Sequence, residues 1–116
     1  MQFYESEFKL MEVLWEVGSI SASDACKILE ERYGWKRNTS YTMLKKCVDK
    51  GYIERTEPHF MCRPLITKKD AQLKNVSEML DSSFESKQDF FRTFLRKENL
   101  SEDEISDLID IVNKLR

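Results

Sequence analysis

The sequence predicts a mainly α-helical fold with one small β-hairpin, in the order of a winged helix-turn-helix followed by three more helices. Three observations carry this prediction. Only three glycines and two prolines occur among the 116 residues, which favours helices with short connections over an all-β fold. Apolar residues recur at helical spacing in six segments. Between the third and fourth segments, two short extended runs flank the turn-like "EPH", as in a hairpin.

Each of the first two helices is predicted from apolar residues at helical spacing and ends at a glycine. The first is expected over residues 6–17, where Gly18 stops it. The second opens at Ser21, a good N-cap residue with Asp24 three positions later, and Gly34 is expected as its C-cap. The residues predicted to form the two buried sides are Phe8, Leu10, Met11, Val13, Leu14 and Trp15, then Ala22, Ala25, Ile28 and Leu29.

The third helix is expected to begin near Asn38 or Thr39, to run to about Lys50 and to end at Gly51. We interpret Trp35, just before it, as a packing residue that fixes the preceding turn. The inward face consists of Ser40, Met43 or Leu44, Cys47 and Val48. The residues left on the outer face are Thr39, Tyr41, Thr42, Lys45, Lys46, Asp49 and Lys50.

The hairpin is predicted from "YIERT" and "FMCRPLIT", which are partly alternating and rich in β-branched or aromatic residues. Pro64 lacks an N–H group, so it must lie at a sheet edge or at the end of its strand. His59 falls at the exposed tip of the turn.

Three short amphipathic helices are expected after the hairpin, and each opens with a capping residue. Thr67 is followed by Asp70, Ser86 opens the next helix, and Ser101 with Glu104 forms a full capping box. The apolar residues of these helices are Leu73, Val76, Met79 or Leu80, and Phe84; Phe90, Phe91, Phe94 and Leu95; and Ile105, Leu108, Ile109, Val112 and Leu115.

We therefore expect a winged-helix DNA-binding domain in residues 1–66 and a helical dimerisation region in residues 67–116. A segment of about 50 residues seldom buries enough apolar surface to stand alone. A second copy of the chain is the simplest partner for its apolar stripes. The residues predicted for this homodimer interface are Leu73, Val76, Leu80, Phe84, Phe90, Phe91, Phe94, Ile105, Leu108, Ile109 and Val112.

Positive charge is concentrated around the third helix. Residues 35–55 carry six basic and two acidic side chains, a local charge of +4 on a chain of net charge −2. A basic face on an acidic chain points to a polyanion, here double-stranded DNA, because the second helix of a helix-turn-helix enters the major groove. At the start of the helix, a phosphate is expected to meet Arg37, Asn38 and Thr39. In the next turn, base edges or phosphates are expected to meet Tyr41, Thr42 and Lys45, and the DNA backbone is expected to meet Lys46 and Lys50. The wing is expected to carry Arg55, His59 and Arg63 to the adjacent backbone or minor groove.

Two alternatives to DNA binding remain open at this point. The helix face could be an ordinary solvated surface, or the winged helix could be a protein–protein interaction module. Catalysis is disfavoured, because His59 is the sole histidine and no glycine-rich phosphate loop occurs. The three cysteines, Cys26, Cys47 and Cys62, contain no C-x-x-C pair and are interpreted as reduced thiols, so neither a metal site nor a cofactor is expected.

No apolar run is long enough to span a bilayer, and the N-terminus does not resemble a secretory signal, so a cytoplasmic location is expected.

The stretch "GWKRNTSYTMLKKCVDKGYIERT" resembles the recognition-helix segment of the penicillinase-repressor family, the BlaI/MecI group with its copper-responsive CopY relatives. The matching residues are Trp35, Thr39, Thr42, Met43, Leu44, Lys46, Lys50 and Gly51. The opening "ESEFKLMEVLWEVGSISASDACKIL" is similar to the family's first two helices, and "FLRKENLSEDEISDLIDIV" to its C-terminal dimerisation helices.

The resemblance implies a homodimeric transcriptional repressor that binds a palindromic operator. In the family, a membrane-embedded sensor protease triggers cleavage of an Asn-Phe bond in the C-terminal part. The matching bond here is Thr93–Phe94, which keeps the phenylalanine but not the asparagine. The copper-responsive relatives carry C-x-C pairs near their C-terminus, and this chain has no cysteine after Cys62. The inducing signal, the operator sequence, the regulated genes and the choice between repressor and activator therefore stay open.

Overall fold

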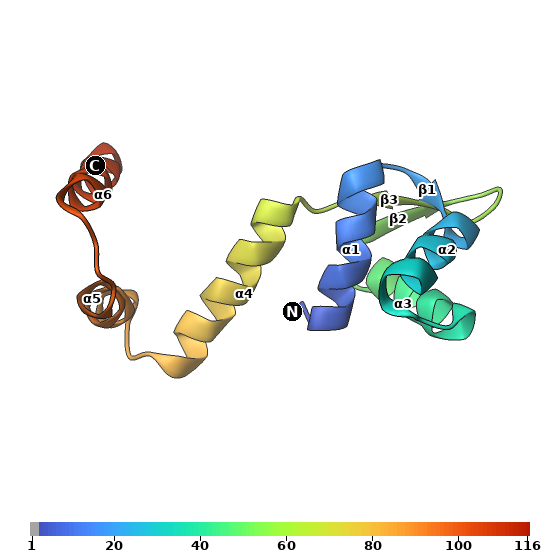
Figure 1. Ribbon diagram of the computed structural model, residues 1–116, viewed down its shortest axis with the longest axis horizontal. Coiled ribbons are helices and arrows are strands. Elements are labelled where there is room, and N and C mark those ends of the chain that lie inside the picture. The colour runs from blue at the N-terminus through green and yellow to red at the C-terminus, as the bar shows by residue number, and fades with distance from the viewer. Residues whose placement is uncertain (1–2) are drawn as a thin grey trace. The chain divides into compact units, whose positions relative to one another are not determined.

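The computed structural model describes residues 3–116, which form six helices and three short strands (Figure 1). The elements are α1 (Glu5–Val17), β1 (Ile20–Ser21), α2 (Ala22–Tyr33), α3 (Arg37–Asp49), β2 (Ile53–Thr56), β3 (Met61–Pro64), α4 (Lys68–Ser83), α5 (Lys87–Lys97) and α6 (Glu102–Lys114). The predicted fold class, mainly α with a small antiparallel sheet, is confirmed.

The chain divides into two compact units, one ending at Glu78 and the other running from Met79 to Arg116. Helix α4 begins in the first unit and ends in the second. The division expected between residues 66 and 67 concerns which part binds DNA and which part dimerises, and it stays a prediction.

Side-chain caps fix the starts of the helices where the sequence predicts them. The Ser21 hydroxyl accepts a hydrogen bond from the backbone N–H of Asp24 at 3.1 Å, and Ser86 does the same at the start of α5. At α6 the exchange is reciprocal, because the Glu104 carboxylate also accepts the Ser101 N–H at 3.1 Å. Each such cap stabilises its helix by about 1 kcal/mol.

The sheet has three strands in the order β1-β3-β2, not the two of the expected hairpin. The additional strand pairs Ile20 with Cys62 and Ser21 with Met61, so β3 is the central strand. A strand of two residues leaves no alternating pattern in the sequence, which is why it was missed. Pro64 is the last residue of β3, one of the two places where its missing N–H group can be accommodated.

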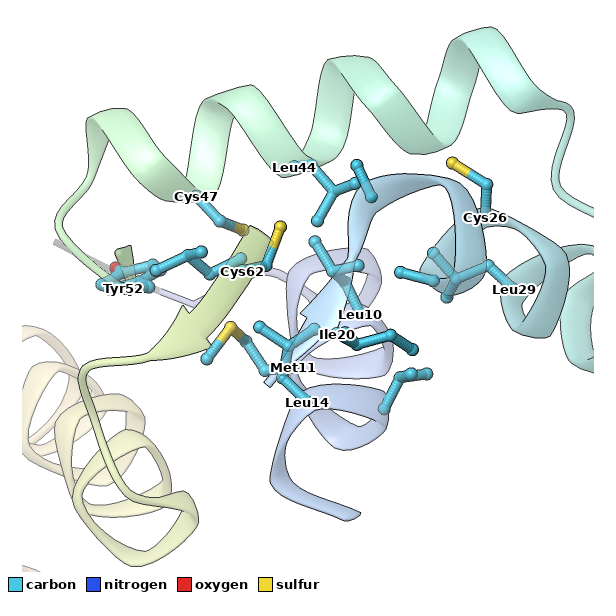
Figure 2. Packing of buried hydrophobic residues seen from close by; sticks show 14 of the residues in the cluster. Leu10, Met11, Leu14, Ile20, Cys26, Leu29, Leu44, Cys47, Tyr52 and Cys62 are labelled. Carbon is cyan, nitrogen blue, oxygen red and sulfur yellow. The ribbon is translucent and has the colours of Figure 1, made fainter. Parts of the chain in front are cut away.

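The hydrophobic core of the first unit lies where α1, α2 and α3 pack against the sheet. Figure 2 shows side chains from the three helices and from β3 converging there. The fully buried apolar residues include Leu10, Met11, Val13, Leu14, Ala22, Ala25, Leu29, Leu44, Cys47 and Cys62. At its margin, the indole N–H of Trp15 donates to the carbonyl oxygen of Ile66 at 2.8 Å and ties the chain after the sheet to α1. The core therefore holds α3 on the domain and leaves its outer face free.

Candidate nucleic-acid interface

The start of α3 is positively charged and has no acidic residue in its first turn. The N-cap residue is Lys36, whose side chain makes no capping hydrogen bond. Arg37, Asn38 and Thr39 follow and are exposed, while Ser40 is buried. The unsatisfied N–H groups and the helix dipole at such an end favour an anion. The three residues predicted to meet a phosphate thus lie together where an anion is stabilised.

The outer face of α3 continues with Thr42, Lys45 and Lys46, all exposed. The ammonium group of Lys46 lies 5.2 Å from the centre of the Tyr4 ring. Within residues 3–116, neither lysine forms an ion pair with a carboxylate. Both charges are therefore available to an incoming polyanion.

Tyr41 is half-buried and packs toward the sheet. Its ring meets the Phe60 ring edge to face, with 6.0 Å between the centroids. On its other side, the Arg37 guanidinium lies 5.3 Å from the ring centroid. Only part of this side chain is therefore available for the expected contact with base edges or phosphates, which stays a prediction.

The expectation that Lys50 lies on the exposed face is wrong. Its side chain is 14% exposed, and its ammonium group lies 2.7 Å from the carboxylate of Glu7, which is fully buried. The Glu7 carboxylate also accepts the backbone N–H of Tyr4 at 2.9 Å. Burial lowers the pKa of Lys50, the bond to Glu7 raises it, and the net shift is upward. This pair joins the first turn of α1 to the end of α3, so Lys50 stabilises the fold.

The wing consists of β2, β3 and the turn between them, and both of its predicted arginines are paired with carboxylates. Arg55 lies 2.7 Å from Glu57, and Arg63 lies 3.0 Å from Glu54. His59 is exposed in the turn with a φ of 71°, a left-handed conformation that non-glycine residues seldom adopt. The charges of both predicted wing arginines are thus partly compensated within the wing.

A shallow hollow of about 590 Å³ lies between the start of α2, α3 and the wing. Its lining includes four residues that are not among the DNA contacts expected from the sequence: Ser21, Ser23, Phe60 and Met61. Tyr41 and His59 line the same hollow. The two serines could have been anticipated, because hydroxyl-bearing residues at the start of the first helix of a helix-turn-helix lie beside the DNA backbone.

None of the three cysteines is among the residues that line this hollow. All three are free and buried. Burial raises the pKa of Cys26, raises that of Cys47 to about 12 and raises that of Cys62 to about 11. A thiolate is the reactive form of cysteine, so these residues serve as core packing groups.

In the second unit, α5 and α6 enclose an apolar groove of about 1090 Å³, which we call the α5–α6 groove. The apolar residues that line it are Phe91, Phe94, Leu95, Leu100, Leu108, Ile111, Val112 and Leu115. Of the residues predicted for the dimer interface, Leu80 alone is buried within the chain, at 7% exposure. Ile111, which is 56% exposed, was not predicted, although its spacing of three from Leu108 gave the signal.

The Thr93–Phe94 bond lies inside α5, with both residues exposed. It is helical, not a loop. No helix within residues 3–116 is long and apolar enough to cross a bilayer. In the same part of the chain, no group of three potential metal ligands gathers.

Comparison with known proteins places these features in context. The family model described as penicillinase repressor matches residues 4–114. The methicillin resistance regulatory protein MecI of Mammaliicoccus sciuri is 25% identical, over 94% of this chain and 91% of that protein. The penicillinase repressor of Bacillus licheniformis is 26% identical, over 97% of this chain and 91% of that protein.

Two solved structures each resemble part of the chain. The DNA-binding domain of the repressor BlaI is 28% identical with a TM-score of 0.56, covering 60% of this chain and 87% of that one. Monomeric Bacillus licheniformis BlaI in complex with the blaP half-operator is 28% identical with a TM-score of 0.53, covering 60% of this chain and 88% of that one.

Proposed function

The chain belongs to the penicillinase repressor family, and from this premise we propose that it is a homodimeric transcriptional repressor that binds a palindromic DNA operator through α3. The family consists of transcriptional repressors and not of enzymes, and the relatives named above are a penicillinase repressor and a methicillin resistance regulatory protein. The BlaI structure with a half-operator supports DNA as the partner of the first unit, because that unit resembles the BlaI domain.

The observation that carries the proposal is the outer face of α3. Its start is cationic, and Lys45 and Lys46 are exposed without carboxylate partners among the described residues. Lysines in this state neutralise phosphates and release counterions, which supplies most of the sequence-independent affinity. Thr42 lies on the same face with an exposed hydroxyl that can reach a base edge.

We propose a narrower set of DNA contacts than the one expected from the sequence. Arg37, Asn38 and Thr39 would hold a phosphate at the start of α3, Thr42 and Lys45 would meet bases, and Lys46 would neutralise the backbone. We place Tyr41 at the edge of the interface, because it is half-buried against Phe60. Lys50 is left out of the set, because its ammonium group is paired with the buried Glu7 carboxylate.

The second unit would supply the dimer contacts. An apolar groove lined by exposed aromatic and aliphatic side chains needs cover, and a second copy provides a self-complementary one. Two recognition helices about one duplex turn apart, or a multiple of it, would then match a pseudo-palindrome.

Release of the repressor by proteolysis has a structural condition. Proteases commonly bind their substrates as extended strands, whereas Thr93 and Phe94 lie within α5. Cleavage at this bond by a membrane-linked sensor system would therefore require α5 to unwind locally. Sequencing the fragments formed in induced cells would show whether this bond is the one that is cut.

A mobility-shift titration tests the main proposal. The chain would be titrated onto the duplex upstream of its own gene and onto a scrambled duplex of the same composition, at several salt concentrations. We expect tighter binding to the natural duplex and an affinity for both that falls steeply with salt. Absence of any shift at low salt would sink the proposal and favour the alternative of a protein-interaction module.

A further inference from the structure

Arg55 is held by three contacts in the wing. Its guanidinium donates to one Glu57 carboxylate oxygen through two nitrogens, at 2.9 and 2.7 Å. The same guanidinium lies 3.6 Å from the centre of the Phe60 ring. Glu57 uses its other oxygen to accept the backbone N–H of Phe60 at 2.9 Å. The carboxylate is therefore fixed by the turn and presents a ready partner to Arg55.

The wing arginine is also joined to the recognition helix. Phe60 is 8% exposed and its ring contacts Tyr41, over which Arg37 lies. A continuous series of side-chain contacts thus runs through Glu57, Arg55, Phe60, Tyr41 and Arg37. It leads from the tip of the wing to the phosphate-facing start of α3. Arg55 consequently lies close to the proposed DNA surface, in a fixed orientation.

The Glu57 carboxylate would compete with a DNA phosphate for the Arg55 guanidinium. A carboxylate that accepts two guanidinium hydrogen bonds uses the same donor fork that binds a phosphate. Its pKa is lowered by the backbone hydrogen bond from Phe60 and by the bond from Arg55, so it stays ionised at neutral pH. Lys45 and Lys46 on α3 face no such competitor within residues 3–116.

We propose that Glu57 attenuates DNA binding by occupying Arg55 in competition with the DNA backbone, so that the wing adds little electrostatic affinity. The proposal rests on the proposed function, because it requires DNA on this face. An exposed ion pair is weak, which makes the exchange of Glu57 for phosphate nearly balanced. Removing one carboxylate charge should then shift that balance measurably.

The test is a double-mutant cycle of Glu57→Gln and Arg55→Ala, with binding measured on a fluorescein-labelled mixed-sequence duplex at several salt concentrations. Glutamine keeps an oxygen that can accept the Phe60 N–H. We expect Glu57→Gln to bind about two- to fivefold tighter per chain than the natural sequence. The slope of log affinity against log salt should steepen by about 0.9, the value for one additional phosphate contact. In the Arg55→Ala background, this gain should disappear.

Glu31→Gln is the matched control. Glu31 is exposed on α2, and its substitution removes the same charge without breaking an ion pair within residues 3–116. Equal effects of Glu57→Gln and Glu31→Gln would overturn the proposal, as would a gain that persists without Arg55, since that would reflect general repulsion. Both results leave the DNA-binding function standing. That function fails only if the natural sequence itself does not bind, in which case the proposal falls with it. Thermal melting of each variant checks that the wing is folded.

Discussion

At the scale of single residues, the pair of Glu7 and Lys50 is the most informative departure from the sequence-based picture. Helical spacing placed Lys50 on the outer face of α3 and gave no reason to bury Glu7. The two residues lie 43 positions apart, so no local pattern links them. A charge buried without its partner is strongly destabilising, which is why the two are useful only together.

We expect Glu7→Gln to lower the free energy of unfolding by about 3 kcal/mol, because it leaves the Lys50 ammonium without its counter-charge. Glu5→Gln is the matched control: the Glu5 side chain is 86% exposed and its pair with Lys9 is 3.5 Å long. The control should change stability by less than about 0.5 kcal/mol. Urea unfolding followed by circular dichroism measures the free energy of unfolding of both variants. If Glu7→Gln is as stable as Glu5→Gln, the buried pair does not hold α1 to α3.

At the scale of secondary-structure elements, local sequence signals were sufficient for most of the fold. The serine and threonine caps at Ser21, Thr67, Ser86 and Ser101 all form in the structure. Those signals act within one helical turn, which is why they can be read from the sequence. β1 escaped prediction because two residues form a strand only through β3, and that pairing is a tertiary event.

The face of α3 allows a prediction that separates affinity from specificity. Lys46→Ala should weaken binding to natural and scrambled duplexes alike and flatten the salt slope by about 0.9. Thr42→Ala should instead reduce the preference for the natural duplex by about 1 kcal/mol, with little change in the salt slope. Titrations of both duplexes over a range of salt concentrations distinguish the two effects.

Lys69→Ala is the control for the first of these variants, because it removes the same charge from the exposed surface of α4. If Lys46→Ala and Lys69→Ala have the same salt slope as the natural sequence, Lys46 does not contact a phosphate. If Thr42→Ala loses affinity but keeps its preference for the natural duplex over the scrambled one, the Thr42 hydroxyl does not contact a base.

At the scale of the whole molecule, the apolar residues of the second unit remain the main argument for a dimer. Their helical spacing could be read from the sequence, and the structure adds that most of them stay exposed in one chain. Which surface covers them is decided by another molecule, so neither helical periodicity nor a single chain can supply the answer. The same holds for the operator and the releasing signal.

Leu108→Asp should convert the dimer to a monomer, because it places a charge in the α5–α6 groove. Loss of the second half-site contact should then weaken binding to a palindromic operator by about 100-fold or more. Ser106→Asp adds the same charge to an exposed position of α6 outside the lining of the groove. Sedimentation velocity that finds both variants dimeric would show that Leu108 is not part of the interface.

The buried thiols of Cys47 and Cys62 have a practical consequence for following the protein in solution. With pKa values raised to about 12 and about 11, neither offers appreciable thiolate to an alkylating reagent while the core is closed. Alkylation must therefore wait for transient opening of the first unit, and its rate reports how often that opening occurs. A duplex that binds only the closed unit lowers the population of the open form by mass action, so slower thiol modification would report how much of the protein has DNA bound.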